Sequence, residues 1–433
     1  MTRTTHCARN RMKRHGFPCP LAVLGIVTVA AVAAAQDRGQ TGVALQKSDG
    51  ELAISVDGQP FATYVWNDPR TTRAYFKQVF APGGEVQLTR HHPPQAGDFS
   101  DHDTFHPGIW WGFGDVGGND YWRMKARIIG GDFIELPQGG KDRGRFAVRN
   151  LMLTNDGKET FCEQTCRYTI LRWPHGILLI CESTFLRKQG DFWLGDQEEM
   201  GIATRVATPI AVASERGGVI RDSQGRTELS AIRTHQSDWC DYSGPISGRY
   251  GGILIMNDPQ NFRKPWWHAV DTGLLVANPL GESELNGRGK RRQNVLVKQG
   301  QPFRLRYGVL VHLHKQQQEF DAAQEYRDFL QTLEALPQPG KPVASAETNL
   351  PQLPDGFQAS IFAREPLIYK PTSVCFDTQG RLMVGQGAQY PVGSKPGRHG
   401  HSVGSPCTIP TSTTISADSL VPPRWTSHSK NGH

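Results

Sequence analysis

The sequence predicts a mainly β protein whose large domain is an antiparallel β-sandwich closed by one C-terminal helix. Short strand-like segments separated by turn signals recur between Glu51 and Leu313. Strands of this kind over about 260 residues favour two large packed sheets. A single amphipathic helix then follows, with apolar residues at helical spacing: Phe320, Ala323, Tyr326, Phe329 and Leu330.

The individual strands are predicted from apolar runs that end at turn residues. Leu52–Val56 and Phe61–Trp66 flank an Asp57-Gly58 turn and form a hairpin. The longest pair is Phe161–Leu171 with Gly176–Leu186, and Ile177–Cys181 within it is continuously apolar, which predicts burial on both faces. Further strands are expected at Ile202–Ala207, Gly252–Met256, Leu274–Ala277, Asn294–Lys298 and Phe303–His312. We expect the helix, about Gln317 to Leu333, to cover an edge of the sandwich.

Residues 1–35 are typical of a cleavable secretory signal. Five basic residues precede the apolar run Leu21–Ala35, and Ala33 and Ala35 form an A-x-A site before Gln36. The run is about fifteen residues, shorter than the roughly 20 that a spanning helix needs. We therefore expect an exported protein, periplasmic or extracellular, without a transmembrane segment in the mature chain; a retained membrane anchor is the alternative.

The basic character of the chain belongs to its two ends. The formal net charge is +7, and removal of the five basic residues of the signal leaves +2. Residues 391–433 account for +3, so the part between is near −1. No folded basic face is implied, which argues against a nucleic-acid partner. We expect a small-molecule or oligosaccharide ligand, and the oligomeric state stays open.

Composition divides the chain after the sandwich domain, which we place at 36–335. Residues 336–352 are rich in Pro, Ala, Ser and Thr and predict a linker. A second unit with strand signals covers 353–390, and the Ser/Thr/Pro/Gly-rich residues 391–433 predict a disordered tail.

Six cysteines lie beyond the signal without C-x-x-C spacing, so a zinc ribbon is not supported. A disulfide between Cys162 or Cys166 and Cys181 is possible in an exported chain, and the sequence leaves it open.

The densest group of reactive side chains lies between Asp98 and Trp122. It places acids and imidazoles beside indoles and turn-forming glycines: Asp101, His102, Asp103, His106, Trp110, Trp111 and Asp115. Such titratable groups are costly in a core and useful in a pocket. An imidazole titrates near neutrality and an adjacent carboxylate fixes its tautomer, so we predict that His102 and His106 act as an acid/base pair aided by Asp101. The alternative is that these residues only cap turns and pack the core.

Two later segments supply candidate partners for this group. Glu198 or Glu199 is predicted as the opposing carboxylate, and Arg205 as a cation that orients it or binds a substrate carboxylate. Trp110, Trp111 and Trp267 are predicted as stacking surfaces for a sugar, and Asp103, Asp115 and His268 as further binding residues. Solvated turns and a half-buried histidine are the alternative interpretation. No residue is assigned to a metal and no cofactor is identified, although imidazoles with carboxylates also suit zinc, copper, iron or manganese.

These segments together resemble a family of exported bacterial proteins, common in planctomycetes, that is labelled methane oxygenase PmoA-like. The resemblance covers about Glu51 to Leu313 and rests on these motifs: Asp101-His102 through Gly108-Ile109-Trp110, Gly114-Asp115-Val116 with Asp120-Tyr121-Trp122, Glu198-Glu199-x-Gly201 with Arg205, Trp239 with Asp241-Tyr242-Ser243-Gly244, and Asn278-Pro279. Many members carry Asp-His-x-His-His-Arg-Gly where this chain reads Asp-His-Asp-Thr-Phe-His-Pro-Gly, so one histidine and the arginine are missing here. The strand pattern also looks like the galactose-mutarotase type of β-supersandwich, whose members bind or transform sugars.

The second unit is similar to the opening of a β-propeller that resembles glucose/sorbosone dehydrogenases. The similarity rests on Leu353-Pro354-Asp355-Gly356-Phe357, Phe362-Ala363-x-Glu365-Pro366 and Phe376-Asp377-x-x-Gly380-Arg381-Leu382. About forty residues are too few to close a propeller, which has at least about four blades. We therefore expect a truncated propeller-like fragment at 353–390.

The function expected from these observations is that of an exported carbohydrate-active protein using His/carboxylate acid–base chemistry, with hydrolase, lyase and epimerase reactions all open. A second hypothesis is a non-catalytic sugar-binding module attached to a propeller dehydrogenase. A third, implied by the family label, is a metal-dependent oxidoreductase.

Overall fold

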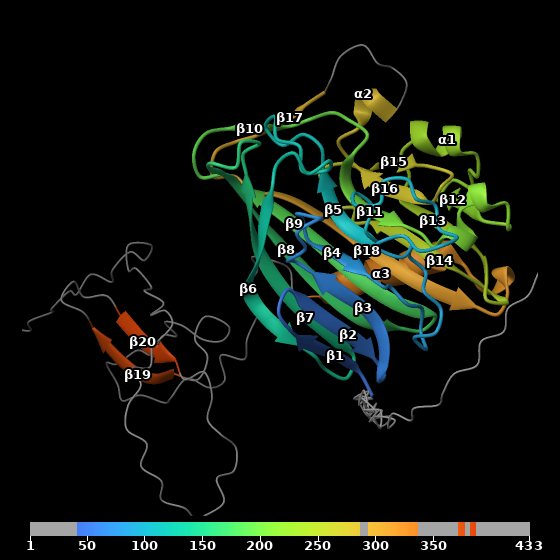
Figure 1. The fold of residues 1–433 in the computed structure, drawn as a ribbon, viewed down its shortest axis with the longest axis horizontal. Coiled ribbons are helices and arrows are strands. Elements are labelled where there is room, and N and C mark those ends of the chain that lie inside the picture. The colour runs from blue at the N-terminus through green and yellow to red at the C-terminus, as the bar shows by residue number, and fades with distance from the viewer. Residues whose placement is uncertain (1–40, 286–292, 337–370, 377–381, 387–433) are drawn as a thin grey trace, which may run out of the picture.

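The computed structural model describes residues 41–285, 293–336, 371–376 and 382–386 (Figure 1). The predicted signal at 1–35, residues 337–352 of the predicted linker and the predicted tail at 391–433 lie outside these ranges. Within the predicted propeller-like fragment, strands β19 (Pro371–Phe376) and β20 (Leu382–Gln386) form an antiparallel pair.

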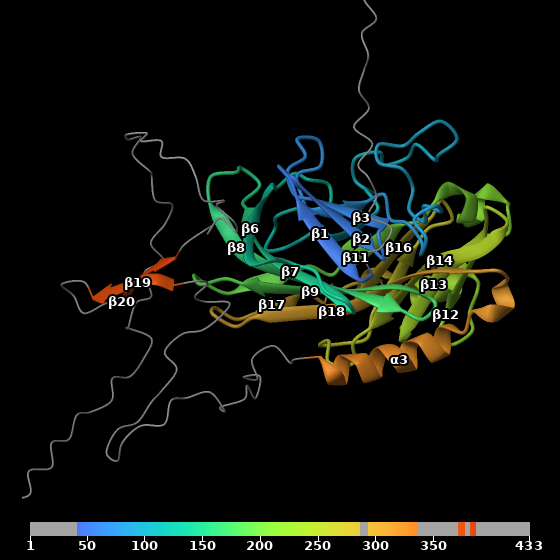
Figure 2. The same ribbon diagram turned by 90° about the horizontal axis from the view of Figure 1, so that it is seen from below.

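Two eight-stranded antiparallel sheets confirm the predicted sandwich (Figure 2). Sheet 1 has the order β1 (Val43–Lys47), β2 (Glu51–Val56), β3 (Gln59–Val65), β4 (Tyr75–Lys77), β5 (Ile109–Phe113), β11 (Met200–Arg205), β16 (Leu274–Asn278) and β15 (Trp266–Ala269). Sheet 2 has the order β12 (Val219–Asp222), β13 (Trp239–Ile246), β14 (Arg249–Asn257), β18 (Phe303–His314), β9 (Gly176–Leu186), β8 (Thr160–Trp173), β7 (Arg143–Leu153) and β6 (Ile128–Gln138). A separate pair joins β10 (Phe192–Leu194) to β17 (Val295–Val297).

The main core lies between the two sheets because strand residues alternate between inner and outer faces. In β5, Trp111 and Phe113 point inward and join the core cluster, which also contains Ile202 of β11 and Tyr307 of β18. Strand β9 is buried along almost its whole length, as its apolar run predicts. The inner faces are therefore filled mainly by apolar side chains, together with the hydrogen-bonded side chains of Asn150, Gln164 and Ser183.

Helix α3 (Ala322–Ala335) packs on the outer face of sheet 2 rather than at an edge of the sandwich (Figure 2). It begins five residues later than the periodicity predicts because Asp321 caps it, accepting bonds from the N–H groups of Ala323 and Gln324. Residues Gln317–Glu319 form a 3₁₀ turn instead. Phe329 is fully buried against the sheet at Gly308, where a Cβ atom would lie 2.7 Å from the Phe329 ring.

Two short helices are further differences from the predicted single helix: α1 (Leu229–Thr234) and α2 (Glu282–Leu285). The four cysteines whose side chains are described, Cys162, Cys166, Cys181 and Cys240, are buried free thiols, so the possible bridge to Cys181 does not form. Within the described ranges, no helix is both long and apolar enough to cross a bilayer.

Candidate functional site

The site is organised around a salt bridge on the outer face of sheet 1. Arg205, the last residue of β11, donates from both terminal nitrogens to the carboxylate of Asp101, at 2.5 Å to Oδ1 and 2.9 Å to Oδ2. The Arg205 side chain is 1 % exposed, whereas that of Asp101 is 37 % exposed. Burial alone would raise the pKa of Asp101, but the hydrogen bonds and charge of Arg205 outweigh it and lower that pKa to about 2. Asp101 is therefore a fixed anion at neutral pH.

His102 presents an open imidazole nitrogen beside this anion. Its backbone has φ of 51°, the left-handed region that non-glycine residues seldom occupy and that clusters at functional sites. Nδ1 lies 3.2 Å from Asp101 Oδ2. Because Asp101 is ionised, Nδ1 is the donor, and Nε2 is left without a hydrogen-bond partner among the described residues. The side chain is 53 % exposed, so Nε2 is available to a ligand.

His106 lies beneath His102 as a buried neutral ring. The two imidazoles stack with centroids 4.6 Å apart at 12°. Arg205 Nη1 donates to His106 Nδ1 at 3.1 Å, so the neutral ring carries its proton on Nε2. Burial, followed by the charge of Arg205, lowers the pKa of His106 far below its ordinary value. His106 can thus donate a hydrogen bond through Nε2, but it is not the proton-exchanging partner of His102 that the sequence predicts.

The floor under these residues is a row of side chains that crosses sheet 1. Strand registers align Tyr75, Trp110, Ala203, Val276 and His268 on neighbouring strands, and in each strand these residues face outward. The indole of Trp110 stacks under His106 at 5.4 Å and 20°. It is only 2 % exposed, so it supports His106 and offers no face for a sugar.

Two buried arginines that the sequence analysis did not identify hold the loop in place. Arg90 donates to the carbonyls of Phe99, Asp101, His102 and His106. Arg73 donates to the carbonyls of Phe105, Tyr121 and Trp122. Burial lowers the pKa of Arg90 to about 10 and that of Arg73 to about 9, so both remain cations at neutral pH. They fix the loop backbone and add positive charge beneath the site.

The two predicted glutamates lie on the same part of the molecule with different partners. Glu198 pairs with Arg233 at 2.9 Å and lies 3.5 Å from Nδ1 of His268. Burial, with the charges of Arg233 and His102, lowers the pKa of His268 to about 3. Glu199 pairs with Arg123, yet burial raises its pKa to about 7, with Glu198 and Asp120 adding to the rise. Glu199 is therefore a carboxyl that keeps its proton to a higher pH than an ordinary glutamate.

Several predicted site residues take structural roles instead. Trp111 and Trp267 point into the core between the sheets, where they cannot stack on a ligand, and Trp267 donates from Nε1 to the hydroxyl of Ser237 at 2.7 Å. Asp103 lies at the exposed tip of the loop and pairs with Arg70 at 3.2 Å. Asp115 accepts from the N–H of Gly118 and closes a turn. The strict alternation along β5 is what separates Trp110 from Trp111.

Comparison with known protein families shows which family the chain belongs to. Residues 51–326 match the family described as Family of unknown function (DUF6807). The chain belongs to this family. Residues 345–407 match a second description, Domain of unknown function (DUF7133). Neither description names an activity, so the PmoA-like label and the propeller gain no support from them. The DUF6807 match contains the whole Asp101 site and both sheets except β1.

Solved structures similar to the DUF6807 domain share little sequence with it. A galactose mutarotase-like protein from Lactobacillus casei ATCC 334 has a TM-score of 0.29 and 10 % identity, covering 63 % of this chain and 100 % of that one. A galactose mutarotase related enzyme from Lactobacillus acidophilus has a TM-score of 0.28 and 8 % identity, covering 62 % and 97 %. No curated protein matches. At these TM-scores the likeness carries no weight for the function.

The nitrogen and oxygen atoms of Asp101, His102 and His106 that could coordinate a metal do not suit a resident metal ion in the DUF6807 domain. One ligand atom of each lies within 4.8 Å of the others. However, both carboxylate oxygens of Asp101 and Nδ1 of His106 already accept bonds from Arg205. Of the imidazole nitrogens in this group, only Nε2 of His102 keeps a free lone pair. A metal ion bound by all three residues would compete with Arg205 for Asp101 and for Nδ1 of His106.

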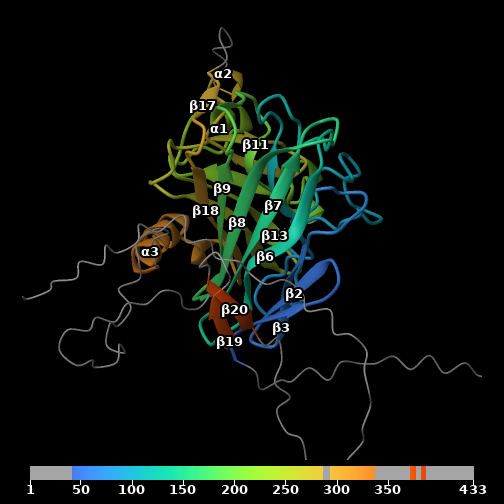
Figure 3. The same cartoon turned by 90° about the vertical axis from the view of Figure 1, so that its left-hand side faces the viewer.

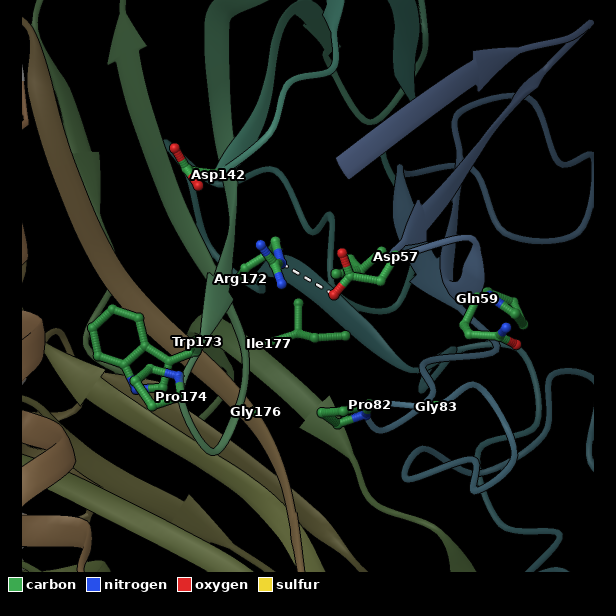
Figure 4. A pocket seen from close by; sticks show the side chains of 12 residues that line it. Asp57, Gln59, Pro82, Gly83, Asp142, Arg172, Trp173, Pro174, Gly176 and Ile177 are labelled. Atoms are coloured by element: carbon green, nitrogen blue, oxygen red, sulfur yellow. Dashed lines mark hydrogen bonds and ion pairs between the residues drawn. The ribbon is translucent and has the colours of Figure 1, made fainter. Parts of the chain in front are cut away.

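The pocket shown in Figure 4 is separate from this site. It lies between the β2–β3 turn and the β8–β9 hairpin, where Arg172 bonds Asp57 at 3.0 Å across the two sheets. None of the predicted site residues lines it. The outer face of sheet 1 therefore remains the place where the predicted acids and imidazoles meet.

Proposed function

We propose that this protein is an exported carbohydrate-active protein, and that it exchanges protons with a sugar at His102 and Glu199. The observation that carries the proposal is the Asp101–His102 pair, locked by Arg205 so that Nε2 of His102 points to an open side. A carboxylate behind an imidazole fixes its tautomer and its orientation, the arrangement of a general base.

Glu199 is the acid partner in this proposal. A carboxyl with a pKa of about 7 is still partly protonated at neutral pH and can donate to a leaving or ring oxygen. His102 and Glu199 thus differ in their roles because their surroundings differ: the first is exposed beside an anion and the second is half-buried. His106 contributes a hydrogen bond from Nε2 and holds the His102 ring by stacking.

The test is a screen of the purified chain against neutral and acidic mono- and oligosaccharides, with thermal shift for binding and chromatography for products. His102→Gln keeps the size and polarity of the side chain but cannot exchange a proton. The matched control is His235→Gln, which changes an exposed histidine at the end of α1. We expect the first variant to keep the thermal shift and lose product formation at least about 100-fold, and the control to keep both.

Full turnover in His102→Gln would contradict the acid–base role. A thermal shift in the unchanged protein without any product, whatever the sugar, would identify a binding module instead. Glu199→Gln separates the two residues further, because it should remove turnover only for substrates whose leaving group needs a proton.

The metal-dependent oxidoreductase implied by the PmoA-like label is the second candidate, and the grouping of Asp101, His102 and His106 is the observation that favours it. Because Arg205 occupies most of these donors, we expect protein purified without chelator to contain well below one transition-metal ion per chain by elemental analysis. One equivalent that is lost in His102→Gln, but not in His235→Gln, would support the oxidoreductase and overturn our assignment.

A further inference from the structure

Helix α3 covers only part of the outer face of sheet 2 (Figures 2 and 3), and the remaining part holds an open pocket. The pocket has a volume of about 590 Å³ and extends from β6 and β7 to β18, with Leu336 at the end of α3 on its border. The apolar residues of this face, Leu178, Leu254, Met256 and Leu310, lie in the cluster under α3. The uncovered part carries charged and hydroxyl-bearing residues beside apolar ones such as Ile180 and Pro302.

The charged residues of the pocket lie in rows because the strand registers place them next to one another on neighbouring strands. Glu135, Ala147, Arg167, Glu182 and Arg306 are paired one to the next across β6, β7, β8, β9 and β18. The neighbouring positions two residues along the strands add Arg145 on β7 and Arg304 on β18, and Arg143 follows Arg145 on the same face. Side chains two apart on a strand share a face, and the glutamates and arginines named above all line the pocket.

Arginine outnumbers acid in this pocket. Five arginines and two glutamates line it, although residues 36–390 have a net charge near −1. Arg167 pairs with Glu135 at 3.2 Å and Arg304 with Glu182 at 2.6 Å, so the surplus positive charge belongs to the other three arginines. Arg143 has no ion-pair partner among the described residues, and Arg145 bonds only the amide oxygen of Gln138. Arg306 is 3 % exposed and bonds Asp258 through Nε, while its buried Nη2 has no acceptor. A buried guanidinium nitrogen without an acceptor is costly unless a ligand supplies one.

We propose that this pocket binds an acidic polysaccharide through its carboxylate or sulfate groups. Strands β7 and β18 are three strand spacings apart, about 14 Å, so Arg143 with Arg145 and Arg304 with Arg306 form two separated walls, while Arg167 on β8 lies between them. A ligand that satisfies both walls has to carry several oxyanions at intervals. Planar guanidinium groups bind carboxylate and sulfate oxygens in pairs, and the hydroxyls of Thr169 and Thr184 between the walls suit sugar hydroxyls.

Other polyanions fit the pocket less well. Its two aromatic lining residues, Phe146 and Tyr168, are buried in the core between the sheets, so nucleic-acid bases have no ring to stack on. An arginine cluster can also bind an acidic peptide, but the hydroxyls of Thr169 and Thr184 favour a sugar, and the poly-glutamate arm of the test below separates the two occupants. The proposal is independent of the reaction assigned to His102.

The test measures binding of the full chain to four polymers by affinity electrophoresis and calorimetry: polygalacturonate for carboxylates, dextran sulfate for sulfates, neutral dextran, and poly-glutamate for an acidic peptide. The variant Arg143→Gln/Arg145→Gln removes two exposed charges that hold no acidic partner in the described structure. The control, Arg216→Gln, removes an exposed arginine from the loop before β12. Thermal melting confirms that each variant folds.

We expect binding to polygalacturonate or dextran sulfate that weakens at least about tenfold between 50 and 500 mM salt, weakens by a similar factor in the double variant, and is unchanged in the control. The stronger of the two polymers identifies carboxylate or sulfate as the preferred group. Equal binding of neutral dextran, equal loss in the control, or a double variant that binds as tightly as the unchanged chain would overturn the proposal. Preference for poly-glutamate would replace the polysaccharide by an acidic protein partner.

Discussion

At the residue scale, the pair of Asp101 and Arg205 determines both the geometry and the stability of the site. The carboxylate compensates a guanidinium that is 1 % exposed and that also donates to His106. Removal of one partner from a buried pair leaves an uncompensated charge, which costs about 3–5 kcal/mol, whereas an exposed pair is worth about 0–1 kcal/mol. The Asp101 side of this pair is partly exposed, so an intermediate effect follows.

We predict that Asp101→Asn lowers the free energy of unfolding by about 2 kcal/mol. Urea denaturation measures it. Asp103→Asn is the matched control two residues away, because its pair with Arg70 is exposed on both sides, and it should change stability by no more than about 0.5 kcal/mol. Equal effects of the two substitutions would show that Arg205 does not depend on Asp101.

Glu199 should make stability depend on pH in a defined window. Burial raises its pKa from the ordinary 4.5 to about 7, so between these values the folded protein binds more protons than the unfolded chain. Stability contributed by the protonated form is therefore lost as pH rises through this window, and the cost is complete above about pH 7.

The variant Glu199→Gln cannot ionise and should be the more stable form above pH 7, by on the order of 1–3 kcal/mol, with the difference vanishing below about pH 4.5. Urea midpoints between pH 4 and 8 test this. Glu198→Gln, which replaces a more exposed neighbour, is the matched control. A constant offset of Glu199→Gln across the range would rule out the raised pKa as its cause.

The sequence identifies some site residues and misses others for a physical reason. His102 and Asp101 are adjacent, so their chemistry is visible locally. Arg90 and Arg73 bind backbone carbonyl groups up to 49 residues away. Every residue has such a carbonyl, so the sequence does not show which ones an arginine binds. Trp111 fails as a stacking surface because its environment depends on which face of β5 points outward, and that is set by pairing with β4 and β11.

At the element scale, hairpins are predictable and sheet order is not. The pairs β2–β3 and β8–β9 join neighbouring segments through short turns, so their bounds are close to those expected. Strand β5 instead pairs with β11, about 90 residues later, and β16 follows as the next strand in the sheet. This non-local strand order places Arg205 beside Asp101 and brings Glu198 close to His268. Local sequence patterns do not predict such an order.

Gly112 on β5 affects both the packing of side chains on this strand and the geometry of the site. A Cβ atom there would lie 2.4 Å from Cε3 of Trp122 and 2.8 Å from Nε1 of Trp110. Both indoles contact His106, with Trp122 edge-on at 5.7 Å. Strand β5 therefore needs glycine because an aromatic ring occupies the space above it.

We predict that Gly112→Ala destabilises the protein by about 1–3 kcal/mol and weakens ligand binding at His102 by displacing the Trp122 ring. Trp122→Phe removes the ring atoms that the new methyl group meets, so the double variant should be less destabilised than the sum of the two single changes. Urea denaturation of the four proteins gives this coupling energy. Simple additivity would mean that the methyl group is accommodated elsewhere.

At the scale of the whole molecule, the two outer faces of the sandwich have different coverings. Loops before β5 lie over sheet 1 and carry the imidazoles, while α3 lies on the opposite side, against sheet 2 (Figure 3). Under the start of α3, Asp241 accepts bonds from His312 and Ser243, and Phe320 stacks on His312 at 3.8 Å. The helix thus seals an apolar cluster and a buried polar network together.

Two truncations test whether α3 completes the fold. We predict that residues 36–336 unfold in one cooperative transition with the urea midpoint of the full chain, because the two-sheet core and the α3 cluster both lie within this range.

Residues 36–315 lack Phe329 and Leu333, which are 0 % and 4 % exposed, and each such buried side chain contributes about 1.5–3 kcal/mol. The shorter chain should aggregate or unfold at much lower urea, since Leu178, Leu254 and Leu310 would face water. If it instead matched the longer one, α3 would be an accessory; a lowered midpoint in 36–336 would mean that residues after Leu336 also stabilise the sandwich.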